Sequence, residues 1–301
     1  MIGWIVLLVL LFLAILFTEE LYRYLFYYKN AVTFGKIFDT KGHVDEYYVY
    51  RKKAAEKMRS LPQQVFQMQS PRGEILKGFF YSNGAEGKKI AILLPGHRSD
   101  HADSGGMIYD YFASRGFDVL GLDHTAAGES GGHFIGFDVF ESQDTLKWID
   151  FLKEKFGESI QIVVYGFSMG GATVMQMSSR CPSNVKFLVE DSGFQNAYSA
   201  MHHSIGPMYT PMRLLNRLLA GYDWNDSDVT ESLQKAAVPM LFIHGTEDKL
   251  VPASDGPKLF ALYNGPKAGF FPPKTRHIEC MFTCPEETAK QLDAFVEKYI
   301  D

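Results

Sequence analysis

The segment from Gln161 to Ala172 constrains the fold more than any other part of this 301-residue chain. It is an apolar, β-branched run, QIVVY, that leads directly into GFSMGG. When a strand turns sharply into a helix around a G-x-S-x-G sequence, the serine stands exposed at the top of an α/β sheet. The turn strains the serine backbone, so its neighbours two positions away must lack bulk, and Gly166 and Gly170 meet that need. We therefore expect a strand–turn–helix unit with Ser168 as a nucleophile, rather than a serine that only caps an ordinary turn.

Short apolar strands alternate with helical segments along the rest of the chain. An antiparallel edge hairpin is expected within residues 60–88, which contain short apolar runs and glycines. Further strands are expected at 89–94, 117–122, 160–165, 185–189, 240–244 and 268–271, and helices at 107–114, 138–156, 169–179 and 285–299. This alternation predicts an α/β fold with a mostly parallel central sheet and helices on both faces. The hydrophobic content of 46% is ample for such a core.

Residues 196–231 interrupt the alternation, because they contain helical apolar runs and no clear strand. They lie between two expected strands of the sheet. We expect a helical lid over the carboxyl edge of the sheet, where α/β proteins bind their ligands. An ordinary crossover helix with long loops is the alternative.

The chain begins with an apolar segment, residues 1–18, that carries no charged side chain. As a helix it would reach roughly 27 Å, close to the thickness of a hydrocarbon core. We expect an uncleaved single-pass membrane anchor here, since a cleaved secretory signal, the alternative, normally has a basic start and a small-residue cleavage site. A juxtamembrane helical segment would then cover 19–59 and the α/β domain 60–301. Lys29 and Lys36, with the arginine at position 23, favour a domain that faces the cytosol.

The charge balance and the cysteines exclude other classes of protein. The formal net charge is −5, and nucleic-acid binding requires clustered Lys and Arg, so no nucleic-acid partner is expected. Cys181, Cys280 and Cys284 provide neither a disulfide framework nor a CxxC metal pair. Cysteine usage therefore does not indicate a compartment.

Ser168 needs a base, because a serine hydroxyl is inert near neutral pH. In the order Ser…Asp…His, the base follows an acid that itself follows a later strand. His277 fits, since it lies between the last expected strand and the terminal helix. Asp248 follows the strand at 240–244 and is the expected acid, with the glutamate before it as the fallback; it would hold the tautomer of the imidazole. His244 ends that strand and is expected to be a buried structural histidine.

These motifs resemble the α/β-hydrolase superfamily, especially its bacterial membrane-anchored or secreted serine hydrolases related to peptidase-S9-like and acyl-esterase domains. The resemblance covers about residues 60–300 and rests on GFSMGG, HGTEDKLVP, the Arg-His before the last helix, and DHTAAGESGG. Thr125 departs from the arginine that is usual in the last motif. Pro95 replaces a histidine that is usual in the family's oxyanion loop. By position, the resemblance implies an oxyanion hole made by the backbone N–H groups of His97 and Met169.

A cluster of histidines and carboxylates raises a metal site as an alternative. Its members are His97, Asp100, His101 and Asp103, with His124 on a neighbouring loop. The segment lacks the glutamate of an HExxH zinc motif and lies where a hydrolase oxyanion loop belongs. We therefore expect neither a metal nor a cofactor.

The expected activity is that of a serine hydrolase, most simply a carboxylesterase that forms an acyl-enzyme on Ser168. The expected partner is a small-molecule ester or acyl substrate, with no obligate protein partner. Apolar lid residues suggest an acyl or aromatic group, although simple packing explains them equally well: Tyr198, Met201, Met208, Tyr209, Met212, Leu214 and Leu218. The alternatives are a serine peptidase or amidase, an acyltransferase or haloperoxidase, and a catalytically silent hydrolase-fold binding module. Esterase is favoured over peptidase because the chain has no propeller domain.

Overall fold

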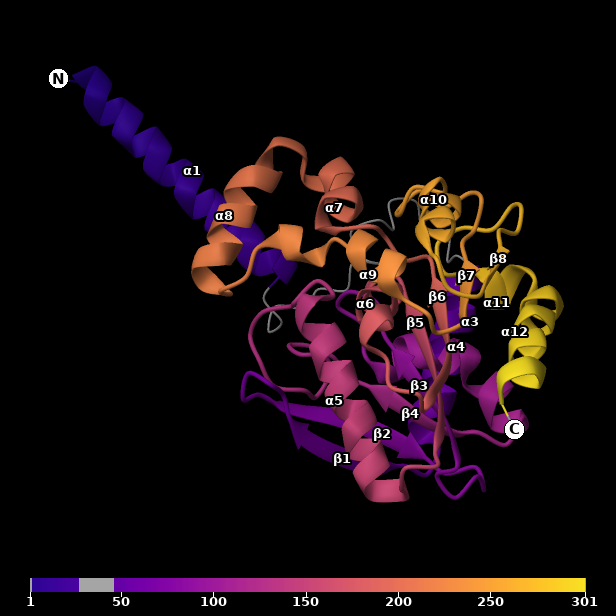
Figure 1. The fold of residues 1–301 in the computed structure, drawn as a ribbon. Helices are drawn as coiled ribbons and strands as arrows, with labels where there is room; N and C mark the ends of the chain where they lie inside the picture. Colours follow the sequence, from indigo (N-terminus) through magenta and orange to yellow (C-terminus); the bar gives the residue numbers. More distant parts are fainter. Residues whose placement is uncertain (1, 27–45, 301) are drawn as a thin grey trace.

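The computed structural model describes residues 2–26 and 46–300, which form an eight-stranded sheet with helices around it (Figure 1). The strands are β1 (Gln64–Gln69), β2 (Ile75–Tyr81), β3 (Lys89–Leu94), β4 (Asp118–Leu122), β5 (Gln161–Phe167), β6 (Val185–Asp191), β7 (Met240–Ile243) and β8 (Lys267–Phe270). Their order across the sheet is β1-β2-β4-β3-β5-β6-β7-β8. The order of the strands across the sheet follows their order along the chain, except that β3 and β4 exchange places.

The sheet is antiparallel at one edge and parallel elsewhere. β1 and β2 form an antiparallel hairpin, and β2 pairs antiparallel with β4. From β4 to β8 every neighbouring pair is parallel. The predicted edge hairpin and the mostly parallel sheet are therefore confirmed. Because the parallel strands end at the same edge, the loops that follow them meet there.

Helices connect and cover these strands. They are α1 (Ile2–Phe26), α3 (Glu46–Ser60), α4 (His101–Ser114), α5 (Val139–Phe156), α6 (Met169–Met177), α7 (Ala197–Ile205), α8 (Tyr209–Leu219), α9 (Thr230–Lys235), α10 (Asp255–Leu262), α11 (Cys280–Thr283) and α12 (Pro285–Tyr299), with 3-10 helices η2 (Ser178–Arg180), η3 (Gly206–Met208) and η4 (Trp224–Ser227). In Figure 1, α5 crosses in front of the sheet, whereas α3 and α4 lie behind it.

Alternate residues of each central strand face two separate apolar cores. In β3, Ile92 packs in the core that contains Trp148 of α5. The next residue, Leu93, packs in the core that contains Phe112 of α4 and Leu292 of α12. A strand that is buried on both faces reads as a continuous apolar run, which is why KIAILL carries no polar alternation. The expectation of helices on both faces is confirmed.

Helix α3 packs directly on α4, although it lies within the segment expected to be juxtamembrane. Ala55 and Met58 of α3 are buried. A Cβ built at Gly106 of α4 would lie 2.6 Å from the carbonyl oxygen of Ala54, so the two helix backbones approach closely. At the surface, Lys57 of α3 pairs with the Asp110 carboxylate at 2.6 Å. Residues 46–60 are thus part of the body of the molecule.

The helical insertion predicted between two strands is present between β6 and β7. Its helices α7 and α8, with η4, enclose an apolar cluster in which Met212 and Trp224 are fully buried. Phe137 and Phe194, from loops at the carboxyl edge of the sheet, belong to the same cluster, as does Met169 at the start of α6. The insertion therefore lies over the edge where the parallel strands end.

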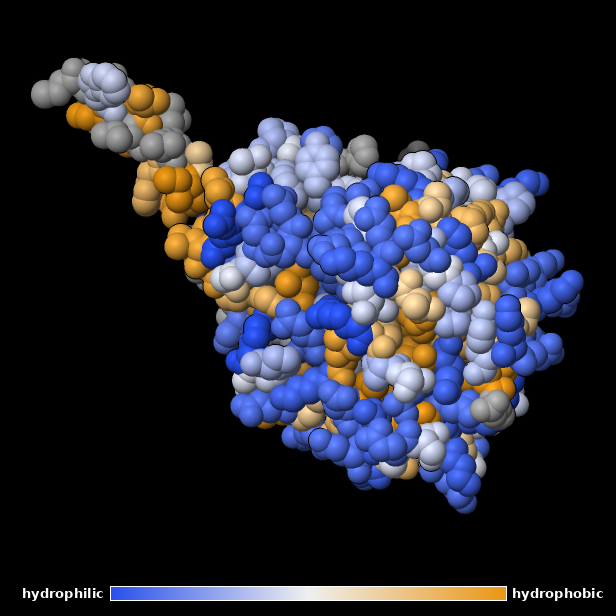
Figure 2. All heavy atoms as spheres, in the orientation of Figure 1, coloured by the Kyte–Doolittle hydropathy of each residue, from blue (hydrophilic) through white to orange (hydrophobic). Residues whose placement is uncertain are grey.

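Helix α1 projects from the body and continues past the expected anchor to Phe26 (Figure 1). Figure 2 shows apolar residues along it, and large side chains such as Trp4 and Phe17 are exposed. Near the body, Tyr22 is fully buried, and its hydroxyl donates a 2.8 Å hydrogen bond to Asn216 Oδ1 of α8.

The membrane anchor expected over residues 1–18 stays a prediction. Across residues 2–26 and 46–300, no helix combines the length and the apolar character that crossing a membrane requires. Residues 27–45, with the lysines on which the expected orientation depends, lie outside the described part of the chain.

Candidate active site

The turn between β5 and α6 places Ser168 at its apex, so the predicted strand–turn–helix unit is confirmed. Ser168 has φ 53° and ψ −112°, a conformation that costs energy for any side chain. A Cβ at Gly166 would lie 2.0 Å from the carbonyl oxygen of Gly170, and one at Gly170 would lie 2.4 Å from that of Leu94. Both neighbours are backbone, so both positions require glycine. The Ser168 N–H donates to the Asp191 carbonyl oxygen at 2.8 Å, which ties the turn to β6.

The loop after β7 brings Asp248 to His277. Asp248 Oδ2 lies 2.6 Å from His277 Nδ1, and the carboxylate is buried. Its other oxygen accepts the N–H groups of two residues of its own loop at 2.8 and 2.9 Å. The loop that carries His277 is held by the Ile278 N–H, which donates to the Ser192 hydroxyl at 3.1 Å. Glu247, the fallback acid, is exposed.

A second imidazole contacts the same carboxylate. His244 Nε2 lies 3.4 Å from Asp248 Oδ2 and 3.3 Å from the Val251 carbonyl oxygen. Burial alone would raise the pKa of Asp248, but hydrogen bonds with His244 and His277 hold it well below its usual range. Burial lowers the pKa of His244, but Asp248 and the nearby Glu190 outweigh it, so that this pKa is raised. His244 is buried as expected; its contact with Asp248 was not foreseen, because sequence does not show which side chains meet behind a loop.

Ser168 and His277 line one cavity of about 220 Å³ at the carboxyl edge of the sheet. Its walls are Arg51, Gly96, His97, Ser99, Ser104, Phe137, Ser168, Phe194, Ala200, Met201, Ile205, Leu250, Val251, His277 and Ile278. The hydrogen bonds of the described residues include none between the Ser168 hydroxyl and the imidazole. Such bonds often tighten only when substrate binds.

The two expected oxyanion donors lie beside the nucleophile. Met169 is the first residue of α6, where backbone N–H groups have no partner within the helix. His97 lines the cavity in the loop after β3. This loop approaches the elbow closely, since a Cβ at Gly96 would lie 3.5 Å from Ser168 Cβ. An oxygen held at that point would meet the positive end of the α6 dipole.

Most of the apolar lid residues named from the sequence do not reach the cavity. Of that set, only Met201 lines it. Tyr209 and Met212 are buried within the insertion, as the packing alternative predicts. Leu214 and Leu218 are 59% and 80% exposed and do not line the cavity.

Sequence reasoning missed other wall residues. Phe194 lies in the loop after β6, and its place near the carboxyl end of a parallel strand is a signal that could have identified it. Arg51 offered no such signal, because it lies in α3, before the first strand of the sheet.

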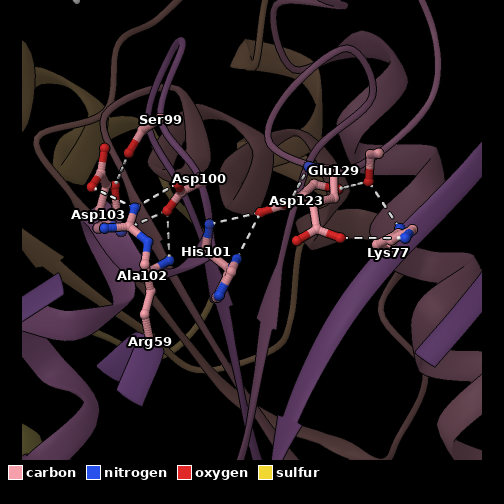
Figure 3. A network of polar contacts seen from close by, with 11 residues as sticks. Arg59, Lys77, Ser99, Asp100, His101, Ala102, Asp103, Asp123 and Glu129 are labelled. Atoms are coloured by element: carbon pink, nitrogen blue, oxygen red, sulfur yellow. Dashed lines mark hydrogen bonds and ion pairs between the residues drawn. The ribbon is translucent and has the colours of Figure 1, made fainter. Parts of the chain in front are cut away.

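The histidine and carboxylate cluster after β3 has structural partners (Figure 3). Asp100 caps α4 by accepting the N–H groups of Ala102 and Asp103, and it pairs with Arg59 at 2.6 Å. His101 Nδ1 faces Asp123 Oδ1 at 3.0 Å. In the part of the chain that the structure describes, no three His, Cys, Asp or Glu side chains are grouped to hold a metal ion.

Thr125, which departs from the expected motif, has a partner of its own. Its hydroxyl donates to Asp144 Oδ2 at 2.6 Å, and both residues are buried. Burial raises the pKa of Asp144 to about 6, although the Thr125 hydrogen bond opposes this. A neutral threonine thus meets the buried acid at the position where an arginine was expected.

Solved structures with a similar fold include esterases. A Pyrococcus furiosus esterase, Pf2001, superposes with a TM-score of 0.66 at 20% identity, over 81% of this chain and 94% of that one. The chain has the α/β-hydrolase fold. The profile of the family described as "Serine aminopeptidase, S33" matches residues 85–220 of this α/β-hydrolase fold, from before β3 into the insertion.

Two relatives in sequence each match about half of the chain. The Bacillus subtilis protein YqkD is 27% identical over 175 residues, 55% of this chain and 57% of YqkD. The zebrafish (Danio rerio) protein named lysophosphatidylserine lipase ABHD12 is 25% identical over 185 residues, 55% of this chain and 46% of its own length. The chain thus spans about half the length of these two relatives.

Proposed function

We propose that this chain is a serine hydrolase that cleaves carboxylic esters, with Ser168 as nucleophile, His277 as general base and Asp248 as the acid that orients the imidazole. One observation carries the proposal: a buried carboxylate lies 2.6 Å from the imidazole, and that imidazole shares a cavity with a serine on a strained turn. These are the parts that acyl transfer needs. The similarity to an esterase and to a lipase supports the same reaction class.

In the proposed reaction, the Ser168 oxygen attacks the ester carbonyl while His277 Nε2 takes its proton. The backbone N–H groups of Met169 and His97 would stabilise the oxyanion. His277 then protonates the leaving alcohol, and it activates the water that hydrolyses the acyl-enzyme. Asp248 stays ionised throughout, in agreement with its low pKa.

The composition of the cavity favours an ester over the peptide substrates of an aminopeptidase, the activity in the description of the matching profile. An aminopeptidase must bind the ammonium group of its substrate, for which a carboxylate is the natural partner. The described residues that line the cavity include no Asp or Glu, and Arg51 supplies a positive charge instead.

The test uses a fluorophosphonate probe, which reacts covalently with an activated serine. The wild-type protein should be labelled, and the Ser168→Ala protein should not. A panel of aryl esters with short to long acyl chains, beside matched aminoacyl anilides, should then show ester hydrolysis at least tenfold faster in kcat/KM. If the folded wild-type protein stays unlabelled, the silent binding module is the better account; faster cleavage of the anilides would support the peptidase.

A further inference from the structure

Arg51 lines the proposed catalytic cavity, although it belongs to a helix that precedes the first strand of the sheet. It lies in the second turn of α3, the helix that packs on α4. Its Nε donates to the Asp103 carbonyl oxygen at 3.1 Å, and its Nη2 lies 3.3 Å from the Ser99 hydroxyl oxygen. Both partners are neutral acceptors. A guanidinium has five N–H donors, so these contacts position the group and leave other donors for a ligand.

The acids around Arg51 are paired with other cations. Arg59 Nη2 lies 2.6 Å from an Asp100 oxygen and 2.9 Å from an Asp103 oxygen (Figure 3). Glu279 pairs with Arg276 at 2.8 Å. Among the described residues, no carboxylate lies within ion-pair distance of Arg51, so its charge is not neutralised from within that part of the chain.

A short series of hydrogen bonds joins Arg51 to the loop that carries the expected oxyanion donor. The Ser99 hydroxyl, which Arg51 contacts, lies 3.0 Å from the Ser104 hydroxyl. Ser104 Oγ in turn accepts the Gly96 N–H at 3.3 Å. All four residues line the cavity with Ser168. An anion held by Arg51 would therefore lie in the same cavity as the ester that reacts.

The remaining walls are mostly apolar. They include Phe137, Phe194, Met201, Ile205, Leu250 and Val251. A half-buried arginine in such surroundings is poorly hydrated, which strengthens its attraction for an anion, and its planar fork matches the geometry of a carboxylate or phosphate. The cavity of the nucleophile thus combines one cationic group with mostly apolar walls.

We propose that Arg51 binds an anionic group of the substrate, a carboxylate or a phosphate, so that the substrate class is an anionic ester with an apolar remainder. This inference rests on the proposed function of Ser168. The anion belongs either to the acyl part or to the alcohol part of the ester. Arg51 is a specificity residue under this proposal and takes no part in the bond-making steps.

The test compares esters of similar size that differ in charge. Aryl butyrate is neutral, aryl hemiglutarate carries a carboxylate on the acyl side, and 4-carboxyphenyl butyrate carries one on the alcohol side; 4-phosphophenyl butyrate replaces that carboxylate by phosphate. The variants are Arg51→Met and Arg51→Lys, with Lys53→Met as the control, since Lys53 is an exposed cation on the same helix. Arg51→Met should lower kcat/KM for the preferred anionic ester about tenfold or more and change that for aryl butyrate less than twofold.

The controls separate recognition from folding and from catalysis. Arg51→Lys should restore part of the preference, and Lys53→Met should leave both rates within twofold. Equal losses for neutral and anionic esters in Arg51→Met would overturn the proposal, because they would indicate a structural role on the Ser99 loop. So would a wild-type protein that shows no preference for any anionic ester. Calorimetry measures the affinity for the substrate without turnover. It compares the binding of 4-carboxyphenyl and 4-phosphophenyl butyrate to Ser168→Ala and to Ser168→Ala/Arg51→Met. A failure of the hydrolase proposal is seen separately, as an unlabelled wild-type protein.

Discussion

Ser168 can adopt its strained backbone conformation because glycines stand at two neighbouring positions, 166 and 170, where no side chain fits. The obstacle at Gly166 is the Gly170 carbonyl, and the obstacle at Gly170 is the Leu94 carbonyl. Backbone atoms at the end of a central strand or in the first turn of a helix cannot move aside as a flexible side chain could. At the scale of single residues, the elbow is therefore the least tolerant part of the proposed site.

Gly166→Ala should lower the free energy of unfolding by about 3–5 kcal/mol, the range of severe core and backbone substitutions. Thermal unfolding measures this change, and fluorophosphonate labelling of the folded fraction reports the geometry of Ser168. Gly84→Ala is the matched control, because a Cβ there meets nothing within 4 Å and only its positive φ of 89° is strained. That control should cost about 1 kcal/mol. Equal stability of the two variants would contradict the steric account.

Asp248→Asn should leave the fold intact and lower kcat for ester hydrolysis by about 10³–10⁴-fold, since an amide no longer stabilises the imidazolium. Steady-state kinetics on an aryl ester measures this loss. Glu247→Gln, a neighbouring exposed acid, is the control and should change kcat less than twofold. If the two variants lose activity equally, Asp248 is not the orienting acid.

His244 contacts the Asp248 carboxylate, so the stability that this contact contributes should depend on pH. The pKa of His244 is raised in the folded protein, so its contribution to stability is present below its unfolded pKa of about 6.5 and is lost as pH rises through the folded value. The loss of unfolding free energy in His244→Gln should therefore be larger at pH 6 than at pH 9. Chemical denaturation at both values measures it, with exposed His202→Gln as control. A gap that is constant with pH would show that His244 contributes by packing alone.

At the scale of elements, α1 is joined to the insertion by a buried polar contact. The Tyr22 hydroxyl donates to Asn216 Oδ1, and Asn216 Nδ2 donates to the Tyr222 carbonyl oxygen at 2.8 Å. Asn216 is fully buried, so it depends on both partners. The amide thus connects α1 to α8 and to the loop that follows α8.

Tyr22→Phe should lower the free energy of unfolding by about 1–2 kcal/mol, because it leaves a buried carbonyl oxygen without its donor. Denaturant titration measures the change. Tyr48→Phe is the matched control, since Tyr48 is 56% exposed on α3. Indistinguishable stabilities would mean that water replaces the lost hydroxyl.

The start of α4 shows why some element boundaries escape sequence analysis. A helix was expected from residue 107, but it begins at His101. The preceding Gly105 and Gly106 disfavour a helix locally. In the fold, the Asp100 cap and the close approach of α3 over Gly106 compensate for that cost.

The mostly parallel sheet, the hairpin and the elbow could be predicted, because apolar periodicity and glycine spacing are local properties. The contacts of Arg51, Tyr22 and His244 could not, because each joins segments that only the complete fold brings together. For the same reason, the apolar spacing of α8 did not show that Leu214 and Leu218 face away from the cavity. For the candidate triad, the sequence predicted the residue types and their order along the chain. It could not predict the 2.6 Å distance between Asp248 Oδ2 and His277 Nδ1.

At the scale of the whole molecule, buried acids make stability depend on pH. Burial raises the pKa of Glu141 and of Glu190 to about 7 and that of Asp191 to about 6. Unfolded carboxyls titrate near 4, so each of these groups binds a proton more tightly in the folded protein. The contribution of these three acids to folding stability should therefore fall as pH rises from about 4 to about 7.

Glu141→Gln should raise the free energy of unfolding by about 1–3 kcal/mol at pH 8 and by less at pH 5, where the folded glutamate is already protonated. Denaturant titration at both pH values measures this. Glu154→Gln, an exposed position on the same helix, should change stability little at either pH. A destabilised Glu141→Gln protein at pH 8 would indicate that the carboxylate is held by interactions outweighing its burial.

The packing of α3 on α4 has a practical consequence for anyone who trims this protein. A fragment that begins at β1 would keep every strand of the sheet. It would, however, expose the backbone of α4 at Gly106 to solvent and remove Arg51 from the wall of the cavity. We expect such a fragment to retain the circular dichroism spectrum of an α/β protein but to lose the selectivity among esters that Arg51 would provide. Shortened versions intended for activity assays should therefore begin no later than Glu46.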